Sequence, residues 1–170
     1  MDVSVLIVSW RVPERLRACL RSIEADPFTG DREVWIVDNA SGDGTPEMIA
    51  KEFPSVNLIA NGTNVGFPKA VNQALEKARG RVAFLLNPDA RVAPGATATG
   101  LAYLAEHPDV GVLGARVVNE AGVEQAEGHR RFPTLWTELC EMTTLARRFP
   151  RSPVFNRWRL AEPAGSEPTE

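Results

Sequence analysis

The residues best suited to bind a ligand follow four apolar runs of the sequence. Ser9 and Trp10 follow the first run, and the segments 38–45, 61–67 and 87–89 follow the other three. Carboxylates and amides in these segments can accept hydrogen bonds or bind a hard cation. Taken singly, Asn-Gly, Asp-Gly and Asn-Pro are ordinary turn formers. Their recurrence after successive runs favours a site for a nucleotide and a cation.

The elements that must position these residues alternate along the chain. Apolar, β-branched runs predict strands at 3–9, 34–37, 56–60 and 82–86, with a fifth at 110–114. Helices are predicted after Pro13, after Pro68, from Thr45 as N-cap, and over 94–107. This alternation predicts an α/β fold with a mainly parallel, Rossmann-like sheet flanked by helices. Ligands bind such sheets beyond the carboxyl ends of the strands, where the polar segments would lie.

The turn after the first strand, Trp10 to Pro13, contains no glycine. It therefore has neither the G-x-G-x-x-G pattern of dinucleotide-binding folds nor a Walker A loop with its lysine. This argues against a dehydrogenase and against a P-loop enzyme. A metal ion and side chains would have to hold the phosphates of a bound nucleotide. Asp89, which follows an apolar strand, is the best cation ligand available.

Four segments together resemble family 2 glycosyltransferases, particularly their bacterial rhamnosyltransferase-like branch. These segments are 5–10, 37–45, 61–72 and 87–89, and the resemblance covers roughly Met1 to Phe132. It implies a GT-A fold and a nucleoside-diphosphate sugar as donor, either a dTDP-sugar or a UDP-sugar. It also implies a divalent cation (Mg²⁺ or Mn²⁺) and inverting transfer to a polysaccharide or lipid-linked acceptor.

The same resemblance implies which residues bind the donor. Asp38 matches the acid that hydrogen-bonds the pyrimidine base, and Ser9 lies in the segment that lines the same pocket. Asp89 matches the last acid of the DXD-type motif, which binds the cation, whereas Asn87 replaces the first acid of that motif. The implied donor-binding residues are Ser9, Asp38, Asn39, Asn64, Gly66, Phe67, Asn72 and Asn87, with Asp89 as the metal ligand.

No catalytic residue is assigned, because the family's base belongs to a Glu-Asp pair and no such pair follows Gly114. We therefore expect a chain that is truncated before its base and inactive alone. The expected parts are a nucleotide-sugar-binding domain at 1–132, a basic amphipathic helical segment at 133–160, and a disordered or truncated tail at 161–170. A different nucleotide-dependent transferase and a noncatalytic nucleotide-binding or interaction domain stay open as alternatives.

Charge is unevenly distributed along the 170 residues. The formal net charge is -3, yet the segment 129–160 contains seven arginines and only two glutamates. A helix there is predicted to carry Leu135, Leu139, Met142 and Ala146 on one face. Such a segment suggests peripheral membrane contact or self-association, and a solvated arginine-rich face is the plainer alternative. No nucleic-acid partner is expected.

The remaining composition indicates a reduced, cytoplasmic protein, at most peripheral to the inner face of the membrane. Two cysteines and two histidines have neither disulfide nor metal-ligand spacing, and Cys19 falls on an apolar helical face. The apolar runs are far shorter than the roughly 20 residues that span a bilayer.

Overall fold

The computed structural model describes residues 1–119, 122–123, 134–150 and 152–156. The chain divides into two compact units, Met1–Asp109 and Val110–Glu170. The domain boundary expected at 132 and the tail expected at 161–170 lie outside the described residues. The first unit contains all of the predicted donor-binding residues.

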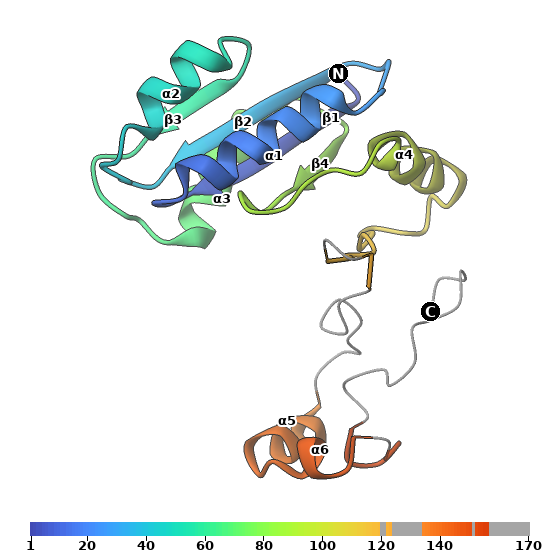
Figure 1. Ribbon diagram of the computed structural model, residues 1–170. Coiled ribbons are helices and arrows are strands. Elements are labelled where there is room, and N and C mark those ends of the chain that lie inside the picture. The colour runs from blue at the N-terminus through green and yellow to red at the C-terminus, as the bar shows by residue number, and fades with distance from the viewer. Residues whose placement is uncertain (120–121, 124–133, 151, 157–170) are drawn as a thin grey trace. The chain divides into compact units, whose positions relative to one another are not determined.

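A four-stranded sheet forms the centre of the first unit (Figure 1). Its strands pair in the order β3-β2-β1-β4, and each pairing is parallel. The elements in chain order are β1 (Val3–Ser9), α1 (Pro13–Ala25), β2 (Arg32–Asp38), α2 (Thr45–Glu52), β3 (Asn57–Ala60), α3 (Phe67–Leu75), β4 (Val82–Leu85) and α4 (Ala96–Glu106). The predicted α/β fold is confirmed. The strand order reverses between β1 and β4, and this reversal is where open α/β sheets bind ligands.

β1 is covered on both of its faces. Val5 and Ile7 belong to a core cluster that includes residues of α1 and α2, whereas Leu6 and Val8 pack with buried alanines of α3. Successive side chains of a strand point to opposite faces of the sheet, so a strand covered on both faces is apolar at consecutive positions. This explains the continuous apolar run at the end of β1.

α1 packs on the sheet through the face that its spacing predicts. Leu16, Cys19, Leu20 and Ile23 are all buried. Pro13 stands in the first turn, where its missing N–H removes no intrahelical hydrogen bond. Cys19 is therefore a core residue, as predicted.

The fifth strand predicted at 110–114 is wrong. This segment has no regular secondary structure, and Val112 and Leu113 are 90% and 41% exposed. An apolar run becomes a strand only where a neighbouring strand accepts its backbone hydrogen bonds. The described residues of the second unit contain no strand to serve as that neighbour.

Two predictions about helix ends also differ from the structure. The N-cap of α2 is Gly44, in a left-handed conformation, and Thr45 is the first helical residue. The carboxylate of Asp43 accepts hydrogen bonds from both the N–H and the hydroxyl of Thr45, which moves the helix start by one residue. α3 ends at Leu75, which is 44% exposed, although Ala78 beyond the helix is partly buried and packs against the same core cluster as Ala70 and Ala74.

The second unit contains α5 (Leu135–Met142) and α6 (Leu145–Arg148) rather than one helix. Thr144 adopts a left-handed conformation (φ 60°) and separates them. Of the predicted apolar face, Leu135, Leu139 and Met142 lie on α5, where Leu135 and Met142 are 92% and 83% exposed, whereas Ala146 lies on α6. Cys140, on a different face of α5, is buried instead. No helix among the described residues is long and apolar enough to cross a membrane.

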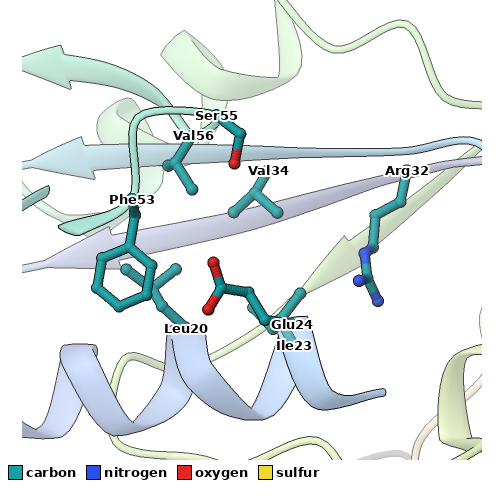
Figure 2. Close-up of a pocket in the computed structure, with 8 residues that line it drawn as sticks. All are labelled: Leu20, Ile23, Glu24, Arg32, Val34, Phe53, Ser55 and Val56. Atoms are coloured by element: carbon teal, nitrogen blue, oxygen red, sulfur yellow. The ribbon is translucent and has the colours of Figure 1, made fainter. Parts of the chain in front are cut away.

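A cavity of about 180 Å³ lies between α1, β2 and the segment after α2 (Figure 2). Its lining residues are Leu20, Ile23, Glu24, Arg32, Val34, Phe53, Ser55 and Val56. Arg32 and Val34 belong to the first half of β2, and Glu24 lies near the end of α1. The cavity is therefore near the amino ends of the strands, away from the predicted donor site.

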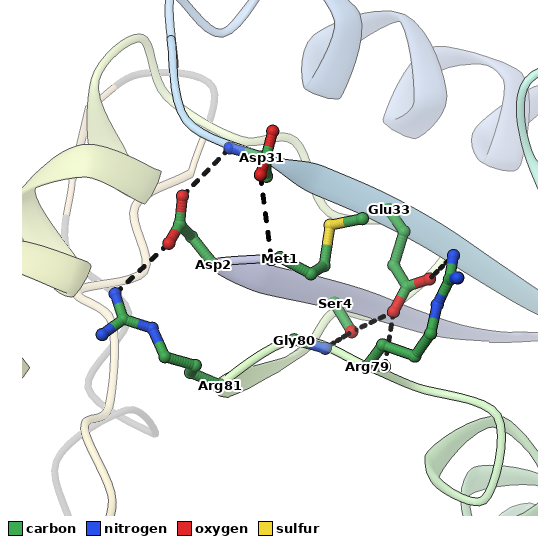
Figure 3. A network of polar contacts seen from close by, with 8 residues as sticks. All are labelled: Met1, Asp2, Ser4, Asp31, Glu33, Arg79, Gly80 and Arg81. Carbon is green, nitrogen blue, oxygen red and sulfur yellow. Dashed lines mark hydrogen bonds and ion pairs between the residues drawn. The ribbon is translucent and has the colours of Figure 1, made fainter.

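A buried carboxylate joins three segments at the same amino-terminal edge (Figure 3). Glu33 accepts hydrogen bonds of 2.6 Å from the hydroxyl of Ser4 and from the N–H of Arg79. Burial alone would raise the pKa of Glu33, but these hydrogen bonds and the nearby Arg79 guanidinium hold that pKa at about 2. The carboxylate is therefore ionised at neutral pH and ties the turn before β4 to β1 and β2.

Candidate functional site

Ser9 and Asp38 lie opposite each other at the carboxyl ends of β1 and β2. Both residues are buried, at 0% and 3% exposure. The N–H of Asn39 donates a hydrogen bond of 2.8 Å to the carbonyl oxygen of Ser9, which extends the pairing of the strands by one step. The Ser9 hydroxyl has no hydrogen-bond partner among the described residues. Ser9 and Asp38 therefore place a buried hydroxyl and a buried carboxylate at the carboxyl ends of β1 and β2.

The carboxylate of Asp38 is held by the turn that follows it. The Ser41 hydroxyl donates to one carboxylate oxygen and the Ser41 N–H donates to the other. Because an ionised carboxylate has about four acceptor positions, Asp38 retains the capacity to accept from a ligand. The Ser41 oxygen in turn accepts a hydrogen bond of 2.9 Å from the N–H of Arg11.

Two residues at these strand ends adopt a backbone conformation that is uncommon outside glycine. Arg11 has φ 57° and Ala40 has φ 61°. Such conformations are costly for residues with a Cβ and concentrate at functional sites. The guanidinium of Arg11 lies 5.1 Å from the ring centre of Trp10, which is half exposed. Neither Arg11 nor Ser41 is among the implied donor-binding residues, although Ser41 lies in the polar segment 38–45 and Asp-x-x-Ser is a spacing at which side chains close turns.

The side chains of Asn39 and Asn64 bind each other. The Asn39 amide nitrogen donates a hydrogen bond of 2.8 Å to the side-chain oxygen of Asn64, and the Asn39 oxygen accepts from the N–H of Val65 at 3.0 Å. The Asn64 oxygen also accepts from the N–H of Gly66, whose φ of 83° suits glycine. These amides hold the loop between β3 and α3 against the end of β2.

Phe67 and Asn72 belong to α3, which begins directly after this loop. The side chain of Phe67 is 48% exposed, and Asn72 is exposed one to two turns further along the helix. Both are therefore accessible to a ligand. Their contact with a donor stays a prediction.

Asn87 and Asp89 follow β4, on the other side of β1 from Asp38. Burial, with a smaller effect from the charge of Asp89, raises the pKa of the Cys19 thiol to about 12. The thiol therefore stays protonated and donates a hydrogen bond of 3.7 Å to the carbonyl oxygen of Asn87. The carboxylate of Asp89 is half exposed and lies 3.7 Å from the guanidinium of Arg15.

The donor atoms near Asp89 fit a cation only if a ligand helps to hold it. Among the described residues, no group of three or more His, Cys, Asp or Glu side chains could hold a metal ion. Asp89 is exposed, and its neighbour in the motif, Asn87, supplies an amide instead of a carboxylate. One carboxylate with solvent is a poor cage for Mg²⁺, which is commonly bound through one or two carboxylates and the phosphates of a substrate. The arrangement fits a cation shared with a diphosphate.

Residues 4–159 match Glycosyl transferase family 2. This chain belongs to glycosyltransferase family 2. An N-acetylglucosaminyl-diphospho-decaprenol L-rhamnosyltransferase from Mycobacterium tuberculosis is 30% identical over 101 residues, which cover 52% of this chain and 33% of the relative. An N-acetylglucosaminyltransferase from Sinorhizobium fredii is 28% identical over 134 residues, covering 76% of this chain and 30% of that protein. The chain spans about a third of the length of these glycosyltransferases.

Solved GT-A glycosyltransferases share the fold of this family 2 member. S. aureus TarS in complex with UDP-GlcNAc has a TM-score of 0.57 and 27% identity, covering 64% of this chain and 32% of TarS. The mannosyltransferase PcManGT from Pyrobaculum calidifontis, solved with GDP-Man and Mn²⁺, has a TM-score of 0.57 and 28% identity. That match covers 61% of this chain and 32% of the mannosyltransferase.

Proposed function

We propose that this chain binds the nucleoside-diphosphate part of a sugar donor at the carboxyl ends of its strands, as the donor side of a glycosyltransferase. The observation that carries the proposal is the placement of Asp38 and Asp89. These carboxylates follow β2 and β4, on opposite sides of the central strand β1. Ligands of open α/β sheets bind beyond these strand ends.

Each carboxylate has a different role in this proposal. Asp38 is buried, and its retained acceptor capacity suits an N–H of a pyrimidine base. Asp89 is exposed and binds a divalent cation together with the phosphates. When bound, that cation would neutralise charge that develops on the departing diphosphate. Phe67, at the start of α3, and Asn72, one to two turns further along, are exposed and would lie alongside the nucleotide and sugar.

The donor is proposed to be a dTDP-sugar or a UDP-sugar, and the acceptor a lipid-linked or polymeric saccharide. The rhamnosyltransferase name of the mycobacterial relative and the UDP-GlcNAc of the TarS complex support these classes. In family 2 chemistry a carboxylate would remove the proton of the acceptor hydroxyl. No residue of this chain is proposed for that role, because the Glu-Asp pair is absent from its sequence.

Calorimetric titration with UDP and dTDP tests the role of Asp38. Asp38→Asn replaces an ionised acceptor by an amide of similar size. Losing a charge-assisted hydrogen bond of this kind should weaken the preferred nucleotide by about 1.5–3 kcal/mol, or roughly 10- to 150-fold. Asp109→Asn changes an exposed acid at the end of the first unit and serves as the matched control. Equal affinities of the folded Asp38→Asn variant and the wild type would remove Asp38 from the site.

A further inference from the structure

The guanidinium of Arg15 and the carboxylate of Asp89 face each other where the strand order reverses. Arg15 stands in the first turn of α1, which follows β1, and Asp89 stands in the turn that follows β4. Nη1 of Arg15 lies 3.7 Å from Oδ2 of Asp89. β1 and β4 are adjacent in the sheet. From β1 the chain continues to β2 and β3 on one side, and it then returns to the other side of β1 as β4. The ion pair therefore marks the crevice in which an open α/β sheet binds its ligand.

Arg15 differs from the other arginines of the same helix. Arg17 binds Glu14 and Glu52, and Arg21 lies 3.5 Å from Glu52 of α2. Both are therefore committed to acids on α1 and α2. Arg15 has Asp89 as its ion-pair partner among the described residues, and its side chain is 70% exposed. Its charge is directed to the turn that carries the proposed cation ligand.

A ligand can replace either partner of the Arg15–Asp89 ion pair. Asp89 is 52% exposed, and an ion pair between two exposed side chains is only marginally stable because water solvates both charges. A divalent cation that binds Asp89 would compete with the guanidinium for the same carboxylate. Arg15, once released, would lie beside that cation and the anionic group that shares it. A guanidinium matches phosphate oxygens through two parallel N–H donors.

We propose that Arg15 is a diphosphate-binding residue, which pairs with Asp89 in the free protein and with the phosphates in the nucleotide complex. This inference rests on the proposed function. It accounts for how the phosphates are held although the turn between β1 and α1 has no glycine-rich loop. It also explains how a motif with only one carboxylate could bind a diphosphate. Asp89 alone holds a cation weakly, and Arg15 adds a second positive charge beside the phosphates.

Titrations of the full chain with UDP, dTDP and the nucleosides uridine and thymidine, without metal, test the proposal. Arg15→Gln should lower the affinity for the preferred diphosphate about 5- to 10-fold and leave the affinity for the nucleoside unchanged, because the nucleoside has no phosphate. Arg15→Lys keeps the charge but loses the paired donors, so its affinity should lie between those of the wild type and Arg15→Gln. Arg21→Gln, at a similarly exposed position of the same helix, should change neither affinity.

Binding of Mn²⁺ alone, followed by electron paramagnetic resonance, gives a second readout. Removal of the competing guanidinium by Arg15→Gln should tighten Mn²⁺ binding about 2- to 5-fold, whereas Arg21→Gln should not. Arg15→Gln with wild-type affinity for the diphosphate would overturn the proposal while leaving the donor site intact. A wild-type chain that binds neither UDP nor dTDP would instead overturn the proposed function, and the role of Arg15 with it.

Discussion

The side-chain amide of Asn39 donates a hydrogen bond of 2.8 Å to the side-chain oxygen of Asn64, 25 residues further along the chain. The pair joins the end of β2 to the loop before α3. Both residues were expected to bind the donor, and the structure uses their amides to hold the site's own loop. Both the amide nitrogen and the side-chain oxygen of Asn39 are bonded within this loop, and its contact with a donor stays a prediction.

Asn39→Ala should destabilise the first unit. The substitution leaves the N–H of Val65 and the side chains of Asn61 and Asn64 without their Asn39 partner. These groups are only partly buried or exposed, and Asn61 and Asn64 keep other hydrogen bonds, so a loss of about 1–2 kcal/mol is expected in urea denaturation. Asn72→Ala removes an exposed amide from α3 and should change stability by no more than about 0.5 kcal/mol. Similar small effects for both variants would show that the loop does not depend on the amide pair.

Gly80→Ala should also destabilise the fold, for a steric reason. A Cβ at Gly80 would lie 2.4 Å from the backbone nitrogen of Ser4, so β4 and β1 would have to move apart. Overpacking of this kind typically costs about 1–3 kcal/mol. Gly62→Ala is the matched control, since nothing lies within 4 Å of its Cβ. Thermal denaturation of the two variants measures the difference. Equal melting temperatures would contradict the close approach of β1 to the turn before β4.

Glu33 should make stability depend on pH in the acid range. Its pKa of about 2 in the folded protein lies below the ordinary value of 4.5. The stabilisation is therefore present above about pH 4.5 and is lost as the pH falls toward 2, with a total on the order of 3 kcal/mol. Urea denaturation at a series of pH values should show the wild type more stable than Glu33→Gln at pH 7, with the difference shrinking in acid. A difference that does not vary with pH would refute the assignment.

The Cys19 thiol should be unreactive in the folded protein. Its pKa of about 12 leaves almost no thiolate at pH 8, and the side chain is fully buried. A Cys140→Ser background isolates Cys19. A thiol reagent should then label the native chain at the rate of unfolding and label the chain in urea at once. Rapid labelling of native protein would place Cys19 outside the core and remove its hydrogen bond to Asn87.

The parts of the fold that the sequence predicts best are those determined by local pattern and burial. Val5 to Val8 are continuously apolar because helices cover both faces of β1. Leu16, Cys19 and Leu20 recur at helical spacing because one face of α1 meets the sheet. Because the strand ends follow from these elements, the sequence pattern alone predicts a candidate site at the carboxyl edge of the sheet.

The parts that the sequence does not predict depend on contacts between distant residues. Leu135 and Met142 form an apolar pattern, but a pattern does not show whether another element covers it, and both are exposed. Val112 lies in an apolar run for which the described part of the second unit provides no neighbouring strand. Asn39 is the type of residue that binds ligands, yet its amide partner is distant in the sequence. The Arg15–Asp89 pair joins residues that only the β1–β4 pairing brings together.

The most direct test of the account is whether a divalent cation and a nucleotide bind cooperatively through Asp89. Calorimetric titrations with UDP and dTDP, with and without Mn²⁺, should show that the metal strengthens binding of the preferred nucleotide at least about tenfold in the wild type and in Asp109→Ala. Asp89→Ala should lose this enhancement while it keeps its fold and its metal-free affinity to within a few-fold. Mn²⁺ enhancement that survives in Asp89→Ala, or a wild type that binds neither nucleotide, would contradict the account.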